Sequence, residues 1–76
     1  MITANDAMVA ADELSVLTPK QREYLTLTAK GLSQKEIASL RGVSEKAVSQ
    51  QMLALHQRTG LTTIEAVVLA VKAGWV

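Results

Sequence analysis

The side chains best suited to chemistry lie between Ser33 and Arg58, and they are hydroxyls, amides and cations. Ser33 and Ser44 are residues of the type that caps helices, beside backbone N–H groups that bind anions. Lys35, Lys46 and Arg58 carry charge that could neutralise a phosphate. This set of groups favours binding of an anionic partner rich in hydrogen-bonding groups over covalent chemistry.

Catalytic and metal-binding functions find little support in the rest of the sequence. The chain has no cysteine, and His56 is its single histidine, so a thiol nucleophile, a disulfide and a His/Cys metal site are all excluded. The four glycines stand apart from one another, so they form no phosphate-binding loop. We therefore predict that the protein is not an enzyme and needs no metal or cofactor.

The composition predicts one small helical domain with an aliphatic core. The chain has 76 residues, of which 49% are hydrophobic and only 3% aromatic, with a net charge of +1. All eight Lys and Arg residues lie from Lys20 onward, which leaves the part from Thr18 onward with a charge of +4. No segment resembles a signal peptide or reaches the roughly 20 apolar residues of a membrane span, so we predict a cytoplasmic, nucleoid-associated protein.

Helix caps recur at regular intervals after Leu17. Capping boxes, in which a hydroxyl residue precedes an acid or amide by three positions, begin at Thr18, Ser33 and Thr62, and Ser44 caps a further helix. A glycine follows each of the four segments and ends it. The sequence therefore predicts an all-α fold with four helices, at about 19–30, 34–41, 45–59 and 63–73.

Residues 1–16 lack this regular pattern. We predict that they form a flexible N-terminal arm with at most one helical turn. Residues 17–76 then form the folded domain.

The two middle helices have a specific layout. The short helix Gln34–Arg41 is joined by Gly42-Val43-Ser44 to the longer helix Glu45–Thr59. This arrangement is typical of a helix-turn-helix, whose second helix fits the major groove of DNA. A plain four-helix domain without DNA contact is the simpler alternative.

Three segments carry a family resemblance: Leu17–Leu25, Gly31–Ala38 and Gly42–Val48. They resemble the LuxR-type (GerE- and NarL-like) DNA-binding domain, and the similarity extends over about 17–76. The resemblance implies a four-helix domain that regulates transcription on double-stranded DNA, with the 45–59 helix in the major groove. It also implies dimerisation through the last helix, and the length is similar to that of stand-alone members.

The candidate DNA contacts follow from this layout. Gln50 could pair bidentately with adenine, Ser49 could bond several base edges, and Leu53 could touch a thymine methyl. A solvated helix surface is the alternative interpretation of each position. The predicted DNA-binding residues are Ser33, Lys35, Ser44, Lys46, Ala47, Ser49, Gln50, Gln51, Leu53 and Arg58.

The last predicted helix is apolar almost all round. One helix of so small a domain cannot bury every face internally, so the surplus indicates an interface. We predict a symmetric homodimer whose interface contains Ile64, Val67, Val68, Val71 and Trp75.

Several residues depart from the family that the chain resembles, and most of them would remove DNA contacts. This chain has Gln21 where the family usually has Glu, Arg41 in place of Leu, Ala47 in place of Thr, Ser49 in place of Lys, Gln51 in place of His and Ile64 in place of Arg. A second hypothesis therefore stays open. In it the domain pairs with another LuxR-type regulator, as a heterodimer through its last helix, and binds DNA weakly or not at all. The third hypothesis is a helical domain with a purely structural role.

Overall fold

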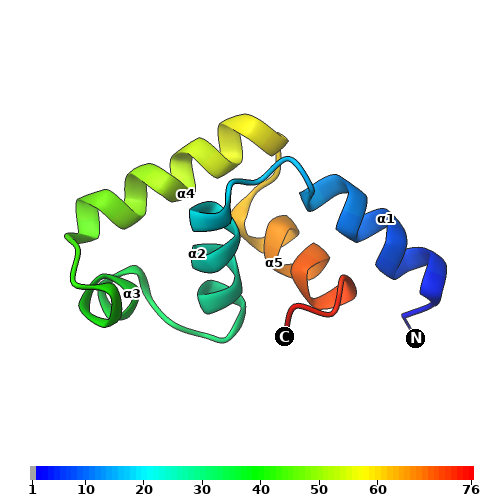
Figure 1. The fold of residues 1–76 in the computed structure, drawn as a ribbon, viewed down its shortest axis with the longest axis horizontal. Helices are drawn as coiled ribbons and strands as arrows, with labels where there is room; N and C mark the ends of the chain where they lie inside the picture. The colour runs from blue at the N-terminus through cyan, green and yellow to red at the C-terminus, as the bar shows by residue number, and fades with distance from the viewer. Residues whose placement is uncertain (1) are drawn as a thin grey trace.

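The computed structural model describes residues 2–76, which form five α-helices and no β-strand (Figure 1). The predicted all-α class is confirmed, and the four predicted helices correspond to α2–α5 with ends within one residue of those observed. The helices are α1 (Ala4–Leu14), α2 (Pro19–Ala29), α3 (Gln34–Arg41), α4 (Glu45–Thr59) and α5 (Thr63–Lys72).

Local hydrogen bonds begin each predicted helix as the sequence indicates. At α3 the Ser33 hydroxyl accepts from the Glu36 N–H at 3.1 Å, and the Glu36 carboxylate accepts from the Ser33 N–H at 3.0 Å. That backbone donor lowers the pKa of Glu36 from its ordinary value, and Thr62 lowers the pKa of Glu65 in the same way. Both caps therefore stabilise the fold at neutral pH and weaken as the pH falls through the lowered pKa values.

The N-terminal segment differs from the predicted flexible arm. Over Ala4–Leu14 it is a three-turn helix, capped by Thr3 and Asp6, that packs along α5. Ala10 and Leu14 are only 1% and 2% exposed. The sequence did not reveal this cap because Asp6, three positions after Thr3, is not the Glu or Gln of the usual capping box. The two buried residues of α1 are also too few to show a helical period. Met1, also within the predicted arm, lies outside the described residues.

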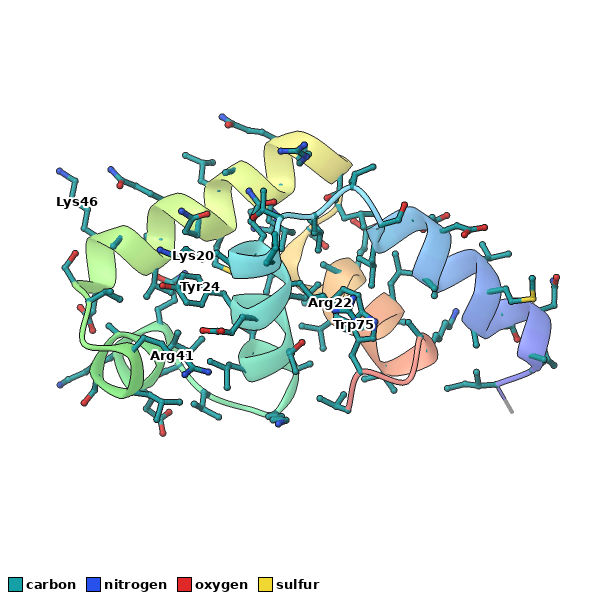
Figure 2. The ribbon with its side chains drawn as sticks, viewed as in Figure 1. Lys20, Arg22, Tyr24, Arg41, Lys46 and Trp75 are labelled. Carbon is teal, nitrogen blue, oxygen red and sulfur yellow. The ribbon has the colours of Figure 1, made fainter. Side chains whose placement is uncertain are left out.

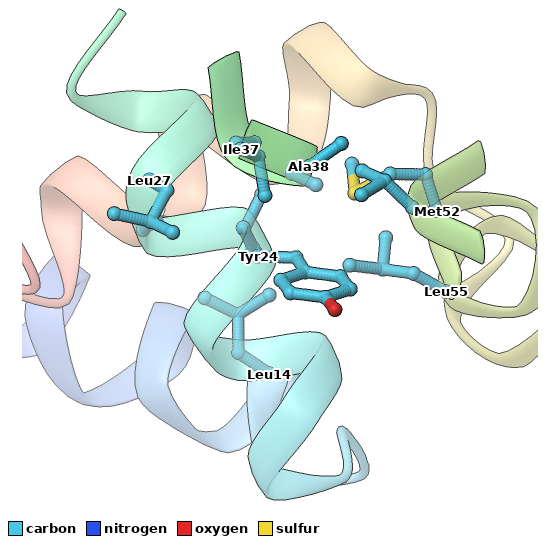
Figure 3. Close-up of a cluster of buried hydrophobic side chains, with 11 residues drawn as sticks. Leu14, Tyr24, Leu27, Ile37, Ala38, Met52 and Leu55 are labelled. Carbon is cyan, nitrogen blue, oxygen red and sulfur yellow. The ribbon is translucent and has the colours of Figure 1, made fainter. Parts of the chain in front are cut away.

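The core draws on all five helices. Figure 3 shows the ring of Tyr24, from α2, beside Leu14 of α1 and Leu55 of α4. Gln21 is the one buried polar side chain in the described part of the chain, and its amide oxygen accepts from the Thr18 N–H at 3.1 Å. The buried cluster consists of Leu14, Tyr24, Leu25, Leu27, Ile37, Ala38, Val48, Met52, Leu55, Ala66 and Ala70.

Helix α2 lies at the centre and contacts α3, α4 and α5, while α1 packs mainly along α5 (Figure 1). Helix α4 runs along one side of the molecule, and both chain ends lie on the side away from it. One long side of α4 is therefore left open to a partner. None of the helices in residues 2–76 is long and apolar enough to cross a membrane.

The packing of α1 can be tested by Leu14→Ala. Removing this buried side chain should lower the free energy of unfolding by about 2–4 kcal/mol, because the neighbouring helices cannot fully close the cavity. Urea denaturation followed by circular dichroism measures the change. Met8→Ala, on the same helix but 67% exposed, is the control and should change the stability by under about 0.5 kcal/mol. Equal effects of the two substitutions would show that α1 is not docked.

Candidate nucleic-acid interface

The turn between α3 and α4 is fixed by its backbone. Gly42 adopts φ = 67°, a left-handed conformation that side-chain-bearing residues rarely adopt, and nothing lies within 4 Å of the place where a Cβ would stand. The Val43 N–H then bonds back to the Ala38 carbonyl at 3.0 Å, and Ser44 caps α4. The predicted three-residue turn is therefore present, and it sets α4 against α3.

The outer face of α4 is polar and exposed. Val48 and Leu55 are fully buried on the inner face, whereas Lys46, Gln50 and Leu53 lie exposed on the other. Leu53 is 55% exposed, and Figure 2 shows Lys46 extending away from the fold at the start of the helix. One side of α4 therefore carries the ammonium of Lys46, the amide of Gln50 and the apolar side chain of Leu53.

Two exposed lysines stand at the beginnings of α3 and α4. Lys35 and Lys46 are the second residues of their helices, next to the caps Ser33 and Ser44. A cation in a first helical turn is disfavoured by the helix dipole, but it adds to the dipole's attraction for an anion. Each helix beginning pairs a lysine with an acid in the same turn, Glu36 in α3 and Glu45 in α4. Arg58, also exposed, lies about 18 Å from Lys46 along α4.

Three predicted contact residues are partly covered or already hydrogen-bonded within the protein. Ala47 and Gln51 are half-buried at the flank of α4. The Ser49 hydroxyl donates to the Gln34 side-chain oxygen at 2.5 Å, so its proton is already engaged. Sequence reasoning missed Gln34, since no local pattern joins two residues fifteen positions apart.

Comparison with protein families agrees with this geometry. The family described as sigma-70, region 4 matches residues 8–54, which run from the middle of α1 to Ala54 of α4. The chain belongs to this family. Sigma-70 region 4 is a helix-turn-helix DNA-binding domain, so the predicted helix-turn-helix class is confirmed. No curated protein and no solved structure matches the chain.

The region 4 match includes the second half of α1 but not α5. The exposed side chains of α5 form a stripe. Ile64, Val68 and Val71 lie at helical spacing and are 78%, 45% and 41% exposed. Val67 and Trp75, the other predicted interface residues, are half-buried and pack on the core. We call the first three residues the α5 stripe.

Trp75 is held in place by a cation. The guanidinium of Arg22 lies 4.4 Å from the centre of its ring, so the end of the chain is attached to α2 (Figure 2). Arg22 is therefore engaged within the protein. Arg41 is engaged too, because its Nε lies 2.6 Å from the Glu23 carboxylate. This ion pair holds Arg41, which stands where the LuxR-type family usually has Leu, at the surface.

His56 has a structural environment. Its Nδ1 lies 2.6 Å from the Leu61 carbonyl oxygen, and its Nε2 lies 3.0 Å from the Thr63 hydroxyl. The ring thus joins the end of α4 to the start of α5. Within residues 2–76 no three His, Cys, Asp or Glu side chains are grouped as a metal site would require.

Proposed function

We propose that this region 4 domain is a sequence-specific, duplex-DNA-binding transcriptional regulator that acts as a homodimer, with α4 in the major groove. The observation that carries the proposal is the exposed face of α4, which holds Lys46, Gln50 and Leu53 opposite the core. An α-helix fits the major groove, and these side chains match groups found there. Such a regulator would act in the cytoplasm, on the nucleoid.

Phosphate contacts would come from the two helix beginnings. Lys35 lies at the start of α3 and Lys46 at the start of α4, just after the turn, so each can meet a backbone phosphate while the outer face of α4 lies between the strands. Arg58 would supply a third contact at the far end of α4. Binding should therefore weaken steeply as salt rises, because each neutralised phosphate releases counterions.

Dimerisation would use the α5 stripe, as the LuxR-type likeness over 17–76 implies. If two copies of α5 pack antiparallel with Val68 at the two-fold axis, Lys72 of one copy comes beside Glu65 of the other. The stripe then buries its apolar side chains, and opposite charges meet at both ends. Two-fold symmetry would place two α4 helices on the halves of a palindrome.

Selection of bound sequences from a random duplex pool tests the proposal. We expect enrichment of a palindrome, whose two halves reflect the dimer. No enrichment at low salt and high protein concentration would remove it. If the protein also captured another helix-turn-helix regulator through α5, that outcome would support the interaction-module hypothesis instead.

Two substitutions on α4 should separate readout of bases from attraction to phosphates. Gln50→Ala should reduce the preference for the selected sequence, since it removes a bidentate base contact with about 1–3 kcal/mol of discrimination. Lys46→Ala should instead weaken binding to all duplexes about equally and make the salt dependence shallower. Anisotropy titrations on selected and scrambled duplexes measure both effects. The same loss for both variants on both duplexes would contradict these assignments.

A further inference from the structure

One hydrogen bond connects the side chains of α3 and α4. Gln34, the first residue of α3, accepts through its side-chain oxygen from the hydroxyl of Ser49, near the beginning of α4. In the described residues, no other side-chain-to-side-chain hydrogen bond joins these two helices. Both residues are exposed.

An exposed bond of this kind contributes little to stability, because water competes for both groups. Its effect is to fix orientation. The Ser49 hydroxyl uses its single proton in the bond, so its oxygen keeps only acceptor capacity. The Gln34 side chain, with its oxygen engaged, keeps the two N–H donors of its amide. The pair therefore offers a donor next to an acceptor.

The position of the pair connects it to the interface. Gln34 is the neighbour of Lys35, and Ser49 is the neighbour of Gln50. All four residues are exposed, so the pair lies on the surface that also carries a cation at the start of α3 and an amide on the outer face of α4. DNA that meets both of these residues would also meet the pair.

We propose that Gln34 is a specificity-determining residue that contacts a base edge through its amide N–H, and that Ser49 is its positioning residue. The oxygen of the Gln34 amide keeps a second lone pair beside its N–H donors, so the amide matches adenine, which presents N7 as acceptor and its N6 amino group as donor in the major groove. Guanine presents two acceptors there, so it satisfies the amide less well. This proposal rests on the proposed function of α4.

Gln34→Glu is the sharpest variant, because the carboxylate still accepts from Ser49 while the amide donors are lost. We expect it to weaken binding to the selected duplex by about tenfold or more, with the largest loss at one adenine. Asn5→Asp makes the same amide-to-carboxylate change at an exposed position of α1, at the opposite end of the molecule (Figure 1), and is the matched control. Anisotropy titrations against the selected duplex and single-base variants of it measure these effects.

The role of Ser49 is tested by a double-mutant cycle. Ser49→Ala should reduce discrimination at the same base pair, and the double variant with Gln34→Ala should bind no more weakly than Gln34→Ala alone. Additive losses would overturn the positioning role. Equal binding by Gln34→Glu and Asn5→Asp, or a uniform loss on every duplex, would overturn the assignment of Gln34. Failure of the unsubstituted protein to bind any duplex would instead reject the proposed function itself.

Discussion

Val68→Asp should convert the proposed dimer into monomers and abolish binding to the full palindrome. Val68 is the middle residue of the α5 stripe and is 45% exposed in the single chain. At a two-fold axis the substitution would bury two carboxylates against each other, which low-dielectric packing strongly disfavours. We expect self-association to weaken by about a hundredfold or more, since such a buried, unpaired charge costs several kcal/mol.

Sedimentation of the protein across a range of concentrations measures this change, and anisotropy follows the loss of palindrome binding. Met8→Asp provides the control, because Met8 is an exposed apolar residue of α1 outside the stripe. It should leave both dimerisation and DNA binding unchanged. An unaltered dimer in the Val68→Asp variant would place the interface elsewhere.

Leu55→Ala should cost a large share of the stability of the domain. Leu55 is fully buried on α4, and its side chain lies beside Tyr24 in the core (Figure 3). The cavity should lower the free energy of unfolding by about 3–5 kcal/mol. A domain of this size is stable by only about 4–11 kcal/mol, so DNA binding should fall with the folded population.

Leu53→Ala is the matched control, since it removes the same atoms from the exposed side of α4. It should change the free energy of unfolding by under about 0.5 kcal/mol while reducing the preference for thymine at one position. Urea denaturation of both variants measures the difference. Similar costs at the two positions would contradict the assignment of inner and outer faces.

The helices that the sequence predicted correctly are those whose ends are determined locally. A hydroxyl residue at Ser33 and an acid three positions later suffice to begin α3, and Gly42 suffices to end it. The same reasoning failed for α1, whose docking depends on Leu14 and the small Ala10 meeting α5. That contact joins opposite ends of the chain, which local patterns do not report.

Helix α5 is apolar both because it packs against other helices and because it carries the exposed α5 stripe. The sequence indicated only an exposed apolar surface. Helix α5 lies between α1 and α2, so two of its sides are covered within the chain. Val67 of α5 is half-buried and packs on the core, whereas Ile64 and the rest of the α5 stripe remain exposed. Helical period alone could not separate the covered sides from the open one, because α1 was not expected to be a helix.

The outer face of α4 could be predicted from its period, because Val48 and Leu55 fix which side turns inward. The engagement of Ser49 by Gln34 could not, since it depends on how α3 crosses α4. The same limit applies to Arg41, whose partner Glu23 lies on another helix. The helical period shows which side of a helix turns toward the core. Contacts between helices determine which polar groups on the other side remain available to a partner.

Entry of the outer face of α4 into the major groove can be tested by site-specific cross-linking. The chain has no cysteine, so Leu53→Cys creates a single attachment point for a photoreactive group. We predict cross-links to bases inside each half of the selected palindrome, and none from the same group attached through Asn5→Cys on α1. Cross-links from α1 with none from α4 would contradict the placement of α4 in the major groove.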